Sequence, residues 1–558
     1  MCGFKRCLLD KINSVPDRTS IIILIITNFI CNNLFLFQLK YYADDWTNLV
    51  YPAPNYRTFS DSFLNPQRPI SYAYIVLQQY IAINPLVFHL LAFITTTISL
   101  ILIYFIFRRI FRDFGYADEL YPFLAAMFFC VLFNKDQIYA WPIMSLGFGL
   151  IATILTIYLY LNNEKKYYLG LSYFIYFLSL LTYELGITVP ALLFLYDYLL
   201  KKDWKKSLYF AVPLFLYLAI RVTSWFGVGG IGEGVNRGFG TYGLDTIVTS
   251  LQYPIITFDV FFRSFIYSAA GYAQMEITLI GLLCIINIAL LVIIYKYLGT
   301  LSISNNRNFK LIYVAIGTIF VFWVPFIIAG YQYLPTRAFY LCDIGIALLL
   351  VCVLIFFQRH INIILPVILI IGLGIFVNQG LFYNWVVSGD NLEKIDNYIK
   401  GNSEELVKYD YIYFNTKSFT NSLPVQIKWA DLSVYTIFQL FKKELFGSQS
   451  LASSLSPPKI NTNSQYDQGY TTYYNSMGLS SGALYSMLNK HTEYKTTFTV
   501  IYGARGDVSV PLTVTKDTIT FKAPNGNIST VNRGNTFEID YNSVFSFDRQ
   551  DHHVLPSR

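Results

Sequence analysis

Long apolar runs, separated by short polar segments, fill the first two thirds of this chain. About 20 apolar residues are needed to cross a bilayer as a helix, and eleven runs reach or approach that length. The runs at 119–133 and 186–200 are short for a span. The pattern predicts an α-helical polytopic membrane protein with spans near 20–39, 86–107, 119–133, 142–161, 168–183, 186–200, 207–224, 276–297, 310–329, 338–357 and 361–377.

The pattern changes after residue 384. Several short segments are rich in β-branched and aromatic residues or alternate between apolar and polar positions, as strands do. They lie at 408–415, 496–502, 508–515 and 517–522, and the last leads into Pro524-Asn525-Gly526, a turn signal. We therefore predict two domains, a multi-span membrane domain at 1–384 and a soluble β-rich domain at 385–558.

Composition and charge support the membrane prediction and indicate how the chain is oriented in the membrane. Hydrophobic residues make up 54% of the 558 residues, and the mean hydropathy is +0.45, which excludes an ordinary soluble fold. The predicted β-rich domain is neutral, with 16 basic and 16 acidic residues, so the net charge of +7 belongs to the membrane domain. Lysine and arginine concentrate in alternate connecting segments, near 5–18, 108–112, 165–166, 201–206 and 296–310, and at Arg359.

This alternation satisfies the positive-inside rule if the N-terminus is cytoplasmic. Eleven spans then leave the C-terminal domain extracytoplasmic, whereas a miscount by one span would reverse that domain but not the first loop. The excess charge reports membrane topology, and we expect no nucleic-acid partner.

Two adjacent acids, Asp44 and Asp45, follow the first predicted span and lie where hydrocarbon gives way to water. Such a pair can hold a proton, a divalent cation or an acceptor hydroxyl against a substrate whose tail lies in lipid. No further metal ligand stands at an obvious spacing. The alternative is that both are solvated loop charges.

Three more charged residues stand at predicted outer ends of spans. Arg68 precedes a half-apolar stretch, 70–83, that suits a helix lying in the membrane interface. It could hold a phosphate or simply extend towards water. Glu184, between two spans, is either functional or a satisfied helix cap. Arg337 could grip a lipid-linked phosphate or serve as an interfacial anchor.

Together these features resemble the integral-membrane glycosyltransferases of the GT-C superfamily. The resemblance covers the layout of residues 20–380. It rests on the acid pair after the first span, the Arg-Pro at 68–69, the Tyr-Glu-x-Gly-x-x-x-Pro at 183–190 and the Leu-Pro-x-Arg-x-x-Tyr at 334–340. These motifs are short and do not identify a subfamily.

The resemblance implies a polyprenyl-phosphate- or polyprenyl-diphosphate-linked sugar donor and a glycan, lipid or protein acceptor. Asp44 or Asp45 would be the general base, and Arg337 would bind the donor phosphate. Glu184 and Tyr340 would line the same substrate site. Inversion at the anomeric carbon would follow from one in-line displacement.

Two other classes remain open. A membrane transporter or lipid flippase would show charges at mid-span and internal repeats, and the sequence shows few such charges and no convincing repeat. An acyl- or phosphoalkyl-transferase would favour an outward-facing histidine or serine nucleophile, and His89 better suits a packed position. The sequence has no P-loop, Rossmann fingerprint or His-Glu-x-x-His motif.

Overall fold

A computed structural model describes most of the helical part of the chain and several strands near its end. The described residues are 15–40, 68–81, 84–116, 118–133, 138–139, 146–164, 166–225, 261–262, 264–265, 268–269, 271–301, 310–328, 336–358, 362–402, 405, 411–415, 499–503, 508–522, 528–532, 534, 536–539 and 542–544. The chain divides into two compact units, residues 1–39 with 48–383, and residues 40–47 with 384–558. Each unit is described by itself.

The first unit is helical. Its elements are α2 (Val15–Asn32), α4 (Pro69–Ile81), α5 (Pro85–Asp113), α6 (Leu120–Val131), α8 (Leu146–Leu161), α9 (Lys166–Thr182), the 3₁₀ turn η3 (Glu184–Gly186), α10 (Val189–Leu199), α11 (Lys205–Leu208), α12 (Ala211–Trp225), α15 (Ile277–Leu298), α16 (Lys310–Ile328), α17 (Thr336–Phe357) and the first part of α18 (Ile364–Gly401).

Four of the described helices are long and apolar enough to cross a membrane. They cover Pro85–Asp113, Ile277–Leu298, Phe339–Phe357 and Ile364–Asn391. The chain is thus a mostly helical protein with the composition of a membrane protein. The other predicted spans that fall on described residues correspond to shorter or less apolar helices, such as α6 with 12 residues and α10 with 11.

Two boundaries differ from the predicted ones for clear reasons. The span expected at 20–39 ends as a helix at Asn32, because Asn33 follows and its side-chain Nδ2 donates to the backbone oxygen of Asn28, 3.1 Å away, which satisfies a carbonyl at the helix end. The span expected at 361–377 continues as one helix to Gly401, through a polar stretch that hydropathy alone does not mark as helical.

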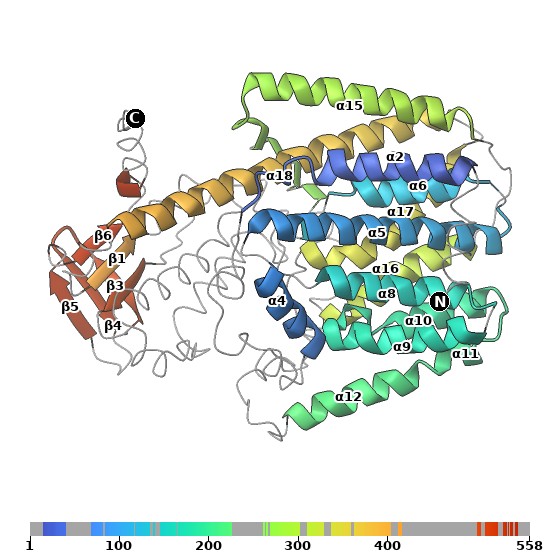
Figure 1. Cartoon of the computed structure of the whole chain (residues 1–558), viewed down its shortest axis with the longest axis horizontal. Helices are drawn as coiled ribbons and strands as arrows, with labels where there is room; N and C mark the ends of the chain where they lie inside the picture. Colours follow the sequence, from blue (N-terminus) through green and yellow to red (C-terminus); the bar gives the residue numbers. More distant parts are fainter. Residues whose placement is uncertain are drawn as a thin grey trace. The chain divides into compact units, whose positions relative to one another are not determined.

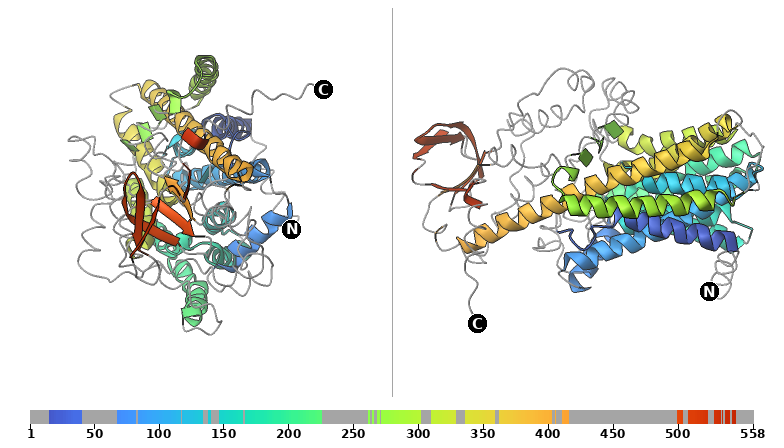
Figure 2. Two further views of the ribbon diagram at one scale, coloured as in Figure 1. Left: turned by 90° about the vertical axis from the view of Figure 1, so that its left-hand side faces the viewer. Right: turned by 90° about the horizontal axis from the view of Figure 1, so that it is seen from above.

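Most of the long helices of this unit lie with their axes roughly parallel, whereas the shorter α4 is steeply inclined to them (Figures 1 and 2). Pairs in close contact include α8 with α9, α16 with α17, and α5 with both α6 and α8. Large aromatic side chains, among them Tyr104, Phe107 and Phe123, are fully buried between them. By contrast, α15 exposes apolar side chains such as Ile285 and Ile288, at 68% and 63%, which is the surface expected to face lipid.

Neutral amides join the helices inside the bundle. The side-chain Nε2 of Gln379 on α18 donates to Asn287 Oδ1 on α15 at 2.9 Å and to the backbone oxygen of Ile30 at 3.2 Å. Nearby, Asn378 Nδ2 donates to the backbone oxygen of Val131 at 3.1 Å. Buried amides of this kind hold helices together in lipid, where water cannot replace the lost bond.

The second unit holds a six-stranded sheet in the order β5-β4-β3-β2-β1-β6. The strands are β1 (Tyr411–Asn415), β2 (Thr499–Gly503), β3 (Val508–Val514), β4 (Thr518–Lys522), β5 (Ile528–Asn532) and β6 (Thr536–Ile539). All neighbours pair antiparallel except β1 and β6, which are parallel. The antiparallel pairing of β4 with β5 brackets the turn expected at Pro524-Asn525-Gly526.

Candidate functional site

Arg68 and the turn after α9 meet in the structure. The guanidinium carbon of Arg68 lies 4.4 Å from the ring centroid of Tyr183, so the cation stands over the aromatic face. Arg68 directly precedes α4, which packs against α9, and Tyr183 directly follows α9. Two of the sequence motifs, 115 residues apart in the chain, are therefore neighbours in space.

The turn that follows Tyr183 is rigidly packed. A Cβ on Gly186 would stand 2.8 Å from Thr153 Oγ1 and 3.3 Å from Ser179 Oγ, so only glycine allows this close approach to α8 and α9. The hydroxyl of Tyr176 donates to the backbone oxygen of Ile187 at 3.0 Å. These contacts explain why the chain reverses direction here with the Tyr-Glu-x-Gly spacing.

Glu184 is the first residue of η3, which contacts α8, α9 and α16. The structure thus places its backbone beside Tyr183 and against α16; its side chain is outside the described part. Arg337 is the second residue of α17, the helix that packs against α16, and its side chain is likewise not described. The motifs of Glu184 and Arg337 therefore share α16 as a neighbour.

Tyr340 is fully buried on α17. Its ring meets Phe129 edge-on, with centroids 5.1 Å apart, and Tyr139 at 6.5 Å. Tyr340 therefore packs among aromatic side chains near the start of α17, and the substrate-binding role that the motif implies stays a prediction. Asp44 and Asp45, the predicted catalytic pair, lie outside the described residues.

One residue with functional potential escaped the sequence reasoning. Asp343 lies one turn after Tyr340 on α17 and is fully buried. An acid within a candidate membrane span is costly and often marks a functional position. The signal was present, because Asp343 is the lone charge in the apolar run of 338–357. His89 on α5 is also fully buried, as expected for a packed histidine.

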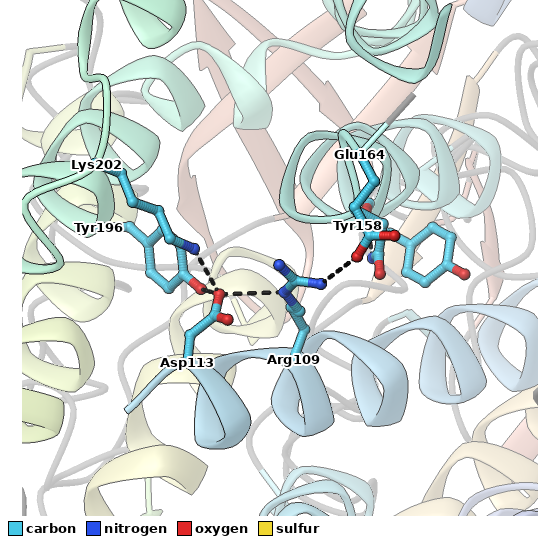
Figure 3. Close-up of polar contacts among 7 residues, drawn as sticks. Arg109, Asp113, Tyr158, Glu164, Tyr196 and Lys202 are labelled. Carbon is cyan, nitrogen blue, oxygen red and sulfur yellow. Dashed lines mark hydrogen bonds and ion pairs between the residues drawn. The ribbon is translucent and has the colours of Figure 1, made fainter. Parts of the chain in front are cut away.

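Charged residues also meet at the other end of α9, which is about 25 Å long for its 17 residues. Asp113 at the end of α5 accepts hydrogen bonds from Arg109 at 3.2 Å, from Lys202 at 2.7 Å and from the hydroxyl of Tyr196 (Figure 3). Arg109 also pairs with Glu164, in the turn before α9, at 3.0 Å. This network joins the ends of α5, α8 and α10.

A second network at the ends of α2, α5 and α6 involves Asp17, whose side chain is 1% exposed. It accepts from Tyr104 at 2.9 Å and pairs with Arg108. Arg108 also pairs with Glu119 at 3.3 Å. Burial and the charge of Asp17 raise the pKa of the Glu119 carboxyl despite the opposing effect of Arg108.

Among the residues that the structure describes, no group of three or more histidine, cysteine, aspartate or glutamate side chains could hold a metal ion. A scan against models of known protein families and searches of curated proteins and of solved structures gave no match to this chain.

Proposed function

We propose that this chain is an integral-membrane glycosyltransferase. It would transfer a sugar from a polyprenyl-phosphate- or polyprenyl-diphosphate-linked donor to a hydroxyl of a glycan, lipid or protein at the outer face of the membrane, with inversion. The observation that carries the proposal is the contact between Arg68 and Tyr183, because it joins the Arg-Pro and Tyr-Glu-x-Gly motifs that the resemblance singled out.

The reaction needs one displacement. The carboxylate of Asp44 or Asp45 takes the proton of the acceptor hydroxyl as its oxygen bonds to the anomeric carbon. The bond from that carbon to the donor phosphate oxygen breaks, and its electron pair leaves with the phosphate. Phosphate is a good leaving group without a protonated acid, so one acidic residue suffices. In-line attack inverts the anomeric configuration.

Arginine side chains would bind the donor phosphate. Arg337 stands at the head of α17, and a planar guanidinium can make two parallel hydrogen bonds to a phosphate. Arg68 supports the same role. The contact of its face with the ring of Tyr183 orients this guanidinium, and its positive charge would add to the attraction of the donor phosphate. Glu184, next in sequence, would orient a sugar hydroxyl.

The proposed topology has eleven spans, a cytoplasmic N-terminus and an extracytoplasmic β-rich domain at 385–558. The two charged networks support the part of this topology that covers the first six predicted spans. They join the start of α2, the end of α5, the start of α6, the α8–α9 turn and the end of α10, which is the pattern of helices that alternate in direction and bring their basic ends to one side.

The test compares rates of transfer from a polyprenyl-linked sugar in membranes that hold equal amounts of each variant. A general base contributes about 10²- to 10⁴-fold, so Asp44→Asn or Asp45→Asn at the true base should lower kcat by that factor. Arg337→Lys keeps the charge but loses the two-pronged grip, and it should mainly raise KM for the donor.

Asp61→Asn is the matched control, because it makes the same chemical change in the same loop. It should leave the rate within about threefold of the parent. Rates within threefold for Asp44→Asn, Asp45→Asn and Arg337→Lys would sink the mechanism, since loss of proton abstraction alone should exceed that effect.

A further inference from the structure

Residues 201–209, between α10 and α12, form a compact charged surface that we name the basic corner. It carries Lys201, Lys202, Lys205 and Lys206, of which the last is half-buried and the others exposed. Lys202 is paired with Asp113. In the described part of the structure the other three lysines make no ion pair. The nearby carboxylates of Asp197 and Asp203 offset this charge only in part, so the corner stays positive.

Packing on the inner side fixes which way the corner faces. Phe210, just after it, is fully buried, with ring centroids 4.6 Å from Tyr173 and 5.2 Å from Tyr176. The hydroxyl of Tyr173 donates to the backbone oxygen of Lys206 at 2.9 Å, and Ser207 is buried beside it. The corner is therefore held against α9, and its remaining side chains point outward.

Aromatic side chains accompany the lysines. Trp204 is 41% exposed and rests edge-on against Phe194, with centroids 5.6 Å apart, while Phe194 stacks on Tyr198. Tyr198 and Tyr209 are 65% and 61% exposed. Tryptophan and tyrosine with an apolar body and a polar tip are favoured at the headgroup level of a membrane.

The apolar surface continues from the corner into α12. Val212 and Phe215 are each 68% exposed and Leu216 is 52% exposed, one to two turns beyond the corner. Large apolar side chains exposed side by side mark a surface that contacts lipid or another protein. A lipid with an anionic head would meet the lysines and its apolar tail would cover the strip, and the acidic phospholipids of the bilayer are lipids of this kind.

We propose that the basic corner binds the headgroups of anionic phospholipids, with Trp204 and Tyr209 at the level of the glycerol backbone and acyl chains over the outer face of α12. A soluble polyanion would meet the lysines but leave Val212 and Phe215 in water. This inference is independent of the proposed transferase activity, because it concerns neither Arg68 nor the turn at Tyr183.

The test uses the full chain reconstituted in phosphatidylcholine vesicles that contain a small fraction of either brominated phosphatidylglycerol or brominated phosphatidylcholine. Bromine on the upper acyl chain quenches nearby tryptophan. The chain has seven tryptophans, so the contribution of Trp204 is the difference between the parent and Trp204→Phe. We expect that contribution to be quenched at a much lower fraction of phosphatidylglycerol than of phosphatidylcholine.

Each surface lysine contributes about fivefold to the attraction of an acidic lipid, so Lys201→Gln with Lys205→Gln should raise the half-quenching fraction of phosphatidylglycerol at least about tenfold. Quenching by phosphatidylcholine should stay unchanged, which shows that the variant is folded and inserted. The control, Lys166→Gln with Lys296→Gln, removes the same charge from two other exposed positions and should change little.

Equal quenching by the two lipids would overturn the proposal. An equal loss in the control would overturn it too, because the effect would then belong to the general charge and not to the corner. Absence of Trp204-dependent quenching by either lipid would also overturn the proposal, because Trp204 would then lie away from the acyl chains of the bilayer.

Discussion

Replacement of Asp17 by alanine should destabilise the helical unit more than any other change to an acid at the ends of α2, α5 and α6. The Asp17 carboxylate is 1% exposed and accepts from the Tyr104 hydroxyl at 2.9 Å as well as pairing with Arg108. Its loss leaves a buried hydroxyl without its acceptor and removes one partner of a partly buried cation.

The size of the loss in unfolding free energy depends on the partner that Arg108 keeps. Breaking a buried ion pair costs about 3–5 kcal/mol. Arg108 keeps Glu119 at 3.3 Å, and its side chain is 21% exposed, so we expect the lower end, about 3 kcal/mol. Asp17→Asn keeps an oxygen for Tyr104 and should cost about half as much. Asp203→Ala, at an exposed acid in the segment between α10 and α11, should cost less than about 1 kcal/mol.

Replacement of Glu119 by glutamine should not lower the free energy of unfolding. Burial raises the pKa of the Glu119 carboxyl in the folded state, so the folded chain holds this proton more tightly than the unfolded chain. The free energy of unfolding therefore falls as the pH rises from the ordinary carboxyl range through the raised pKa. At neutral pH the amide should therefore match the parent or exceed it in stability.

The assay is thermal unfolding in detergent, followed with a thiol-reactive dye. Among the cysteines that the structure describes, Cys31, Cys130, Cys342 and Cys352 are buried and react only on unfolding, whereas Cys284 is exposed and contributes to the starting signal. The expected order of midpoints is Glu119→Gln at or above the parent, then Asp17→Asn, then Asp17→Ala. A midpoint for Glu119→Gln as low as that of Asp17→Ala would refute the reasoning.

Three further predictions follow from the outer ends of the helices and the proposed topology. In a double-mutant cycle of Arg68→Gln with Tyr183→Leu, the effects on kcat/KM should couple by about 1 kcal/mol, and strictly additive effects would deny the cation–ring contact. Gly186→Ala should lower the unfolding free energy by about 1–3 kcal/mol, because its Cβ would overlap a buried hydroxyl; an unchanged midpoint in the thiol assay would show that the turn can relax. Reporter fusions after Lys206 and Asn415 should read cytoplasmic and external respectively, and a cytoplasmic reading after Asn415 would remove one span.

Much of the helical layout was predictable, because a long apolar run in lipid can satisfy its backbone N–H and C=O groups internally only as a helix. Helix ends were less so. The apolar run around α2 continues past Asn32, and the early stop depends on a side-chain bond from Asn33 that only the folded chain reveals. The polar end of α18 carries no hydropathy signal, although it is helical to Gly401.

In the candidate site, too, single residues could be predicted from the sequence but their contacts could not. Arg68 and the Tyr-Glu-x-Gly turn could each be singled out by charge and position, but their contact depends on how α4 packs against α9. Tyr340 shared a motif with Arg337, and its complete burial on α17 could not be foreseen from that motif; its substrate-binding role stays a prediction. Asp343 could have been noticed as a lone acid in an apolar run, but its complete burial depends on how α17 packs in the folded chain.

Sugar transfer is tested most directly in cells that lack this protein. Their surface glycans and their polyprenyl-linked sugars would be compared with those of cells restored with the parent chain or with the Asp44→Asn, Asp45→Asn double variant. The account predicts that one sugar disappears from a surface glycan while its lipid-linked donor accumulates, and that the parent but not the double variant reverses both changes. Unchanged glycans and unchanged donor, or full rescue by the double variant, would contradict it.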